Sequence, residues 1–298
     1  MSTDTGFFRS WGSALARASN PAYRRDMTQA TAPRITVGVF DAPEADDAVR
    51  WAARHAQHTG GTLHLLHAFV WTELDVNTDP VPGLSGSGIR SAANALIVDA
   101  VRIAREIAPD VPITSQIVDG NAVPVLVEAS GESDLMVVGG RGLGRLLTLV
   151  VGSKSLALAA KSHCPVVVVR GDIDGDGPIG LVDHGEDHAN EQRAADLAAA
   201  WGRDLVLIVR AMTSPDEAQH VLGAVRDRLG RTHPQVYVRD VVIASAETAR
   251  ELVHASEGAS LMVVAGERSA KDASRVHAPR QLVTVLRYAN TPVWIERS

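Results

Sequence analysis

Short apolar runs alternate with helix-like patterns along most of the chain. The apolar runs of the first part, rich in β-branched side chains, cover residues 35–40, 63–70, 113–118, 135–138 and 166–169. Apolar residues at helical spacing begin near residues 44, 89, 122 and 153, each between two of these runs. Runs that are apolar at consecutive positions are typical of strands buried on both faces, in parallel sheets covered by helices on each side. The pattern therefore predicts a doubly wound α/β domain.

The same order of elements recurs in the second part of the chain, with apolar runs at 179–182, 205–209, 236–243, 261–264 and 293–295. Segments 126–138 and 252–264 share eight of thirteen residues at an offset of 126. Such a repeat predicts two tandem copies of one unit. We expect domains at residues 34–171 and 178–298. Residues 1–33, rich in arginine and without periodicity, are predicted to be a disordered tail, with a transit peptide as the alternative.

Composition narrows the classes of partner. The net charge of −6 argues against nucleic acid, whose binders carry a basic excess. Every apolar run is of strand length, so we expect no membrane span. Cys164 is the only cysteine, which excludes an intramolecular disulfide and favours a reducing, cytoplasmic location.

A glycine-rich loop follows the fourth apolar run of the first copy. Residues 139–144 contain four glycines, and Gly152, Ser153, Lys154 and Ser155 then open a helix. Ligands of open α/β sheets bind beyond the carboxyl ends of the strands, where glycine lets main-chain N–H groups approach phosphate oxygens. The first turn of a helix adds unpaired N–H groups and the positive end of the dipole. The loop therefore predicts a phosphate site.

These residues resemble the universal stress protein family, whose ATP-binding members carry Gly-x2-Gly-x9-Gly-(Ser/Thr). Gly139, Gly142, Gly152 and Ser153 match that pattern. The resemblance covers roughly residues 34–171 and, more weakly, 178–298. It implies two flavodoxin-like domains, each a five-stranded parallel sheet of order 3-2-1-4-5, with ATP held at those four positions through its ribose and phosphates. It also implies that the end of the second strand, near Ala68, lies beside the adenine.

Other phosphate motifs fit less well. A Walker motif needs glycine directly before lysine, but Lys154 follows Ser153. A dinucleotide fingerprint follows the first strand of its unit, whereas this loop follows the fourth. The remaining alternative is that the glycines only form a long turn.

One departure from the family pattern concerns the base. ATP-binding members usually end the first strand with aspartate, but Phe40 occupies that place and Asp41 follows it. A regular strand would turn Asp41 to the opposite face. Either a bend restores the contact or base recognition is weakened. Arg141, Arg145 and Lys154 supply positive charge for phosphates.

The second copy has lost the loop. Ala265 and Arg268 replace the first two glycines, and Pro279 with Arg280 replaces the glycine and serine. No phosphate site is expected there, because Pro279 lacks an N–H donor.

Further acidic and histidine clusters are interpreted as structural. The acidic stretch 172–177 imitates a calcium loop but lies between strands, so we interpret it as a linker. Residues 183–188 contain acids and a histidine pair, which are expected at the start of a helix rather than around a metal. No metal site is predicted, and Cys164 is interpreted as a small buried hydrophobe.

Three functions remain open from the sequence. The first is a stress-response regulator that binds ATP, with or without Mg²⁺. The second is a nucleotide-free interaction protein in which Phe40 closes the base pocket. The third is a slow ATPase, since the loop offers no evident base and catalysis is not indicated. The closing strands, 166–170 and 293–297, are expected to pair within the chain, with a homodimer left open.

Overall fold

The computed structural model describes residues 32–69, 87–140, 153–183, 188–210, 215–243, 248–266 and 285–297. Residues 33–298 form one compact unit. The predicted tail, residues 1–33, lies almost entirely outside the described residues.

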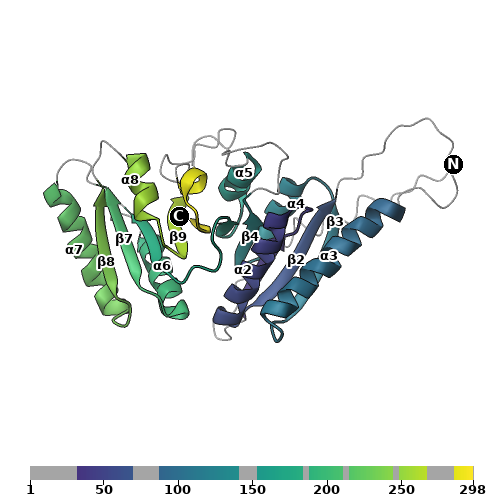
Figure 1. The fold of residues 1–298 in the computed structure, drawn as a ribbon, viewed down its shortest axis with the longest axis horizontal. Helices are drawn as coiled ribbons and strands as arrows, with labels where there is room; N and C mark the ends of the chain where they lie inside the picture. The colour runs from purple at the N-terminus through teal and green to yellow at the C-terminus, as the bar shows by residue number, and fades with distance from the viewer. Residues whose placement is uncertain are drawn as a thin grey trace, which may run out of the picture. The chain divides into compact units, whose positions relative to one another are not determined.

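The described residues of the N-terminal half form five strands and four α-helices (Figure 1). In chain order these are β1 (Arg34–Gly38), α2 (Pro43–Thr59), β2 (Thr62–Phe69), α3 (Ser87–Ile107), β3 (Ile113–Asp119), α4 (Ala122–Ala129), β4 (Leu135–Gly139), α5 (Ser153–Lys161) and β5 (Val166–Val169). A short 3-10 helix, η2 (Ser130–Glu132), follows α4.

The C-terminal half repeats this order. Its elements are β6 (Ile179–Asp183), α6 (His188–Trp201), β7 (Leu205–Arg210), α7 (Pro215–Thr232), β8 (Val238–Ile243), α8 (Thr248–Ala255), β9 (Leu261–Gly266) and β10 (Val293–Arg297).

All ten strands lie in one sheet, in the order β3-β2-β1-β4-β5-β10-β9-β6-β7-β8. Within each half the order is 3-2-1-4-5 and the neighbouring strands are parallel. The fold class predicted from the sequence is therefore confirmed. At the junction β10 runs antiparallel to β5, with Trp294 opposite Val167.

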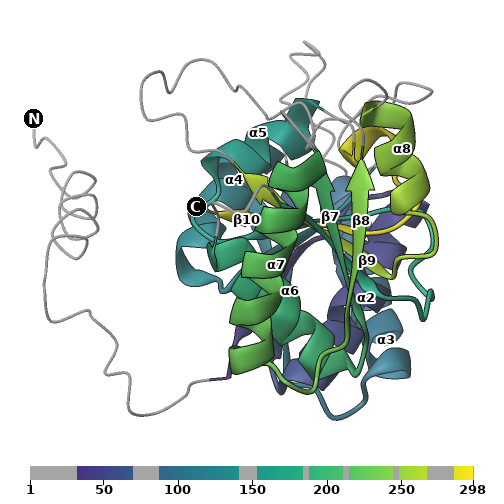
Figure 2. The same cartoon turned by 90° about the vertical axis from the view of Figure 1, so that its left-hand side faces the viewer.

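Helices cover both faces of the sheet, which explains why the central strands are apolar at consecutive positions. One core lies under α2, α3, α6 and α7, and the other lies under α4, α5 and α8. Figure 2 shows the C-terminal half, with α6 and α7 on one side of β7 and β8 and α8 on the other. Val166–Val169, for example, alternates between the two cores, with every residue buried. Two faces to bury require two sets of apolar side chains on one strand.

Helix α2 is stabilised at both ends by local signals. Pro43 stands in its first turn with Glu44 and Asp46, where acidic side chains favour the helix dipole. Gly60 ends the helix in the left-handed conformation, with φ of 65°.

An aromatic cluster joins the two halves beside β5 and β10. The rings of Trp51 and His55 from α2 stack with centroids 5.2 Å apart, and His55 lies edge-on to Trp294 at 5.6 Å. Trp201, at the end of α6, lies 5.8 Å from Trp51. Burial, followed by the charges of His58 and Arg193, lowers the pKa of His55 to about 3, so this imidazole is neutral at physiological pH.

The segment between β5 and β6 is held by an arginine from each half. Arg54 Nη1 donates to the carbonyl oxygen of Ile173 at 2.8 Å and pairs with Asp174, while Arg203 donates to the carbonyl oxygen of Asp176. The two arginines, Ile173 and Asp174 line a cavity of about 270 Å³ together with Trp51 and Trp201.

Candidate functional site

The candidate site lies where β1, β2 and β4 end. Helix α5 begins at this edge, because it must return the chain to Val166, which pairs with Met136 at the start of β4. The last residue of β4, Gly139, is followed by Gly140, whose N–H donates to the carbonyl oxygen of Val169 at 2.7 Å. The carboxyl rim of an open α/β sheet is the usual position of a ligand.

Gly139 is in close contact with the backbone of α2. A Cβ atom at residue 139 would overlap the carbonyl oxygen of Glu44 and lie 2.8 Å from its carbonyl carbon. Packing of β4 against the first turn of α2 is therefore a sufficient reason for glycine here. A phosphate role for Gly139 is neither required nor excluded by this contact.

Phe40 and Ala68 lie on the same face of the rim. Both are half-buried and pack against the core under α4 and α5, next to Leu66. Strand β1 ends at Gly38, earlier than the sequence pattern indicates, and Phe40 lies beyond it with its ring over Gly38. Asp41 follows in a bend and is exposed. The rim thus offers an apolar surface where an aspartate was expected.

His67 links the ends of β1 and β2. Its Nδ1 atom lies 2.8 Å from the carbonyl oxygen of Val39, and Val39 N donates to the carbonyl oxygen of Leu66 at 2.9 Å. His67 was not predicted from the sequence to lie at the rim, because a histidine within a strand has no fixed role.

Ser155 has a buried hydroxyl at the start of α5. The residue is 1% exposed, and its Oγ atom has no hydrogen-bond partner among the described residues. A buried hydroxyl without a partner costs free energy unless a bound group or a water satisfies it. This orphaned atom, in the first turn of a helix at the rim, fits a bound anion.

The other predicted site residues are less completely described. Ser153 and Lys154 begin α5, as predicted, while Arg141, Gly142 and Gly152 lie outside the described residues. In the second copy Ala265 lies in β9, and the residues predicted to replace the rest of the loop also lie outside the described part.

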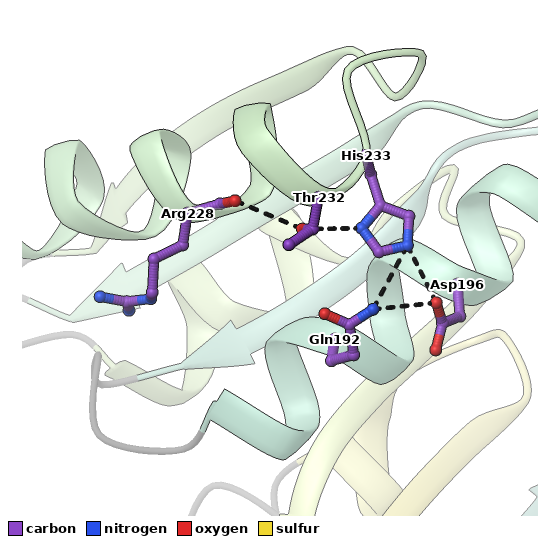
Figure 3. A network of polar contacts seen from close by, with 5 residues as sticks. All are labelled: Gln192, Asp196, Arg228, Thr232 and His233. Carbon is purple, nitrogen blue, oxygen red and sulfur yellow. Dashed lines mark hydrogen bonds and ion pairs between the residues drawn. The ribbon is translucent and has the colours of Figure 1, made fainter.

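A polar network between α6 and α7 combines an acid, an imidazole and a hydroxyl (Figure 3). Asp196 Oδ1 lies 2.9 Å from His233 Nε2, and Thr232 Oγ1 lies 3.0 Å from His233 Nδ1. The Thr232 hydroxyl donates to the carbonyl oxygen of Arg228 at 3.3 Å. This end of α7 presents carbonyl oxygens, which repel a developing oxyanion. The network is therefore suited to holding the two helices together.

The acidic segment between β5 and β6 is tied within the protein. Asp172 Oδ1 accepts a hydrogen bond from Asp174 N at 2.9 Å, and Asp174 pairs with Arg54. In the described ranges no group of three histidine, cysteine, aspartate or glutamate side chains has the geometry to hold a metal ion.

Cys164 is buried before β5, as the sequence indicated. Burial raises the pKa of its thiol to about 11, and the residue is 5% exposed. A thiol in this environment is a poor nucleophile.

The helices within the described residues include none that is long and apolar enough to cross a bilayer.

Comparison with known proteins decides the family. Residues 32–170 match the model of the universal stress protein family. Universal stress protein Rv2623 of Mycobacterium tuberculosis is 32% identical over 289 residues, covering 88% of this chain and 96% of that protein. The chain belongs to the universal stress protein family.

Two other universal stress proteins are similar to this chain over most of its length, one in sequence and one in fold. Universal stress protein Rv2005c of M. tuberculosis is 28% identical over 256 residues, with 77% of this chain and 85% of that protein covered. The crystal structure of a universal stress protein from Archaeoglobus fulgidus aligns with a TM-score of 0.70 at 14% identity, over 89% of this chain and 96% of that one. At this identity the likeness shows the fold alone.

Proposed function

We propose that this universal stress protein binds an adenine nucleotide, ATP, at the carboxyl rim of its N-terminal half and acts as a nucleotide-linked regulator of a stress response in the cytoplasm. The observation that carries the proposal is the orphaned hydroxyl of Ser155 in the first turn of α5, at the rim where β1, β2 and β4 end. An anion there would meet the N–H groups and the positive dipole end of α5.

The chemistry of the surrounding residues supports each part of ATP. Phe40 and Ala68 offer an apolar surface suited to a base. The main chain around Gly142, Gly152 and Ser153 would bind ribose and phosphates, with Arg141 and Lys154 supplying charge. A magnesium ion bound with the phosphates would offset part of their negative charge.

We also propose that the two halves are separate domains, residues 34–171 and 178–298, and that only the first holds nucleotide. The antiparallel contact of β5 with β10 supports a role of the second domain as a fixed partner of the first. It covers an apolar strand edge that would otherwise be open to association.

A thermal-shift titration with Mg-ATP tests the proposal. At 100 times its dissociation constant a ligand stabilises the folded state by about 2.7 kcal/mol. We expect such a shift in the wild type and its loss in Gly142→Arg. Gly223→Arg is the matched control, because a Cβ at Gly223 on α7 meets nothing within 4 Å. No shift in the wild type at millimolar nucleotide would contradict the proposal.

A nucleotide-free interaction protein is the second candidate, favoured by two contacts at the rim. Gly139 has a packing role against Glu44, and the ring of Phe40 lies over Gly38. Phe40→Asp separates the candidates. If Phe40 closes a base pocket, this variant gains nucleotide binding that the wild type lacks. If the wild type already binds through the apolar surface, the variant binds nucleotide no more tightly.

A slow ATPase is the third candidate. ATP turnover by the purified protein, compared with that of Gly142→Arg, tests it.

A further inference from the structure

A groove lies between β8 and α8 in the C-terminal half, away from the proposed nucleotide site. Its volume is about 480 Å³. The strands contribute Val206, Val241 and the charged Arg239 to the lining, and the α8 side contributes Glu251, His254 and Glu257.

Strand β8 is an edge strand with exposed apolar side chains. It pairs with β7 on one side and is the last strand of the sheet on the other, as Figures 1 and 2 show. Val241 and Val242 are 36% and 38% exposed, and Tyr237, just before the strand, is 65% exposed. An open edge beside apolar side chains is a template for another extended chain.

The N-terminal half carries different residues at the equivalent strand positions. There His64 of β2 lies 2.8 Å from Thr114 Oγ1 of β3, and Gln116 is the next residue of β3 on that face. In the C-terminal half the positions of His64 and Gln116 are taken by Val206 and Val241. The position of Thr114 is taken by Arg239, so apolar side chains have replaced His64 and Gln116 on either side of a charged one.

On the helix that faces these strands, an apolar residue of the N-terminal half is replaced by a charged one. Val125 of α4 is buried in the core, whereas Glu251 takes its place on α8 by the 126-residue offset of the repeat. The Oε2 atom of Glu251 is buried and has no hydrogen-bond partner in the described ranges. A buried carboxylate oxygen requires a donor, best a cationic one.

The charges around the groove leave it acidic on the α8 side. Glu257, just beyond α8, has its Oε2 atom 2.9 Å from Nδ1 of His254 in the last turn of that helix. On the strand side Arg239 lies 3.9 Å from Asp204, so its charge faces an acid of its own. A ligand that fits therefore carries an apolar group for Val241 and a cation for Glu251.

We propose that this groove, which we call the β8 groove, binds an extended segment of a partner protein that carries apolar and basic residues in turn at every second position. The segment adds along β8 through its main chain. Side chains of an added strand alternate between its two faces, so that residues two apart enter the groove together, an apolar one beside Val241 and a basic one toward Glu251. A second copy of this chain fits less well, because its own groove presents the same carboxylates instead of a cation.

Fluorescence anisotropy with the labelled heptapeptide Ser-Val-Ser-Lys-Ser-Val-Ser, which presents valine and lysine on one face of a strand, tests the proposal on the full chain. We expect saturable binding with a dissociation constant below about 1 mM. Two control peptides replace lysine by glutamate or valine by serine. A third carries N-methyl groups on alternate amides, which removes the donors that a strand needs. Each control is expected to bind at least about tenfold more weakly.

Two variants exchange groove residues for those of the other half, and they are therefore compatible with the fold. Val241→Gln and Glu251→Val should each weaken the valine–lysine peptide about tenfold, since one removes apolar contact and the other the carboxylate. Val98→Gln is the control, because Val98 is 66% exposed on α3 of the other half, and it should bind as the wild type does.

Equal binding of all four peptides, or unchanged binding by both groove variants, would overturn the proposal. So would the absence of any binding up to the solubility limit of the peptide. Sedimentation showing a dimer that Val241→Gln dissociates would assign the groove to a second copy instead.

Discussion

Gly139, the last residue of β4, lies directly against the carbonyl group of Glu44 in the first turn of α2. A side chain at residue 139 would enter the backbone of that helix, with its Cβ 2.8 Å from the carbonyl carbon. The first glycine of the predicted phosphate loop is thus also a packing residue, because it sets how closely α2 approaches the sheet.

This contact predicts that Gly139→Ala destabilises the fold whatever it does to a ligand. Overpacking of this kind costs about 1–3 kcal/mol. Gly223→Ala is the control, since its Cβ meets nothing within 4 Å and alanine favours a helix. Urea unfolding of both variants checks this. Equal stability of Gly139→Ala and the wild type would contradict this, because α2 would then make room for the added methyl group with no loss of stability.

His55 predicts a pH dependence of stability. Burial lowers the pKa of His55 to about 3 from its ordinary 6.5, so the folded state holds it neutral while the unfolded chain protonates it. The contribution of neutral His55 to the free energy of unfolding is therefore complete above pH 6.5 and is lost as the pH falls toward 3. Between pH 7 and pH 5 the loss amounts to about 2 kcal/mol.

The measurement is urea unfolding at pH 7 and pH 5 with His55→Phe, which keeps an aromatic ring beside Trp51. We expect the variant to lose about 2 kcal/mol less than the wild type over this range. His220→Phe is the control, because His220 is exposed on α7 of the other half. An equal loss in wild type and His55→Phe would contradict a buried, neutral His55.

A buried ion pair between α6 and α7 gives a third prediction. Glu191 is 2% exposed and accepts two hydrogen bonds from Arg228, at 2.9 and 2.6 Å. Removing one member of such a pair leaves a buried charge and costs about 3–5 kcal/mol. Arg228→Leu should therefore be far less stable than Glu191→Leu combined with Arg228→Leu. A double variant no more stable than Arg228→Leu would show that the pair is not the cause.

The sequence predicted the fold well because the sheet depends on local patterns. Val166–Val169 is apolar throughout, and that alone indicates burial on both faces. The strand order of each half was predicted from the resemblance to the universal stress protein family, and the repeat extended this prediction to the second half. The end of β1 was less predictable, since Phe40 continues an apolar run but lies outside the strand.

Contacts between distant residues could not be predicted. No local pattern pairs Glu191 with Arg228, or brings Trp51 of one half beside Trp201 of the other. The same holds for the site, where the glycine spacing indicated a phosphate loop but gave no sign that Gly139 touches Glu44. Such contacts depend on how helices are placed over the sheet, which the periodicity of a single segment does not encode.

The central claim is that one nucleotide binds, and only in the N-terminal half. Isothermal titration of the full chain with ATP measures this directly through its stoichiometry. We predict one ATP per chain, with binding abolished by Gly142→Arg and retained by the same substitution at Gly223. Two sites per chain, or no heat of binding at millimolar ATP, would contradict the account.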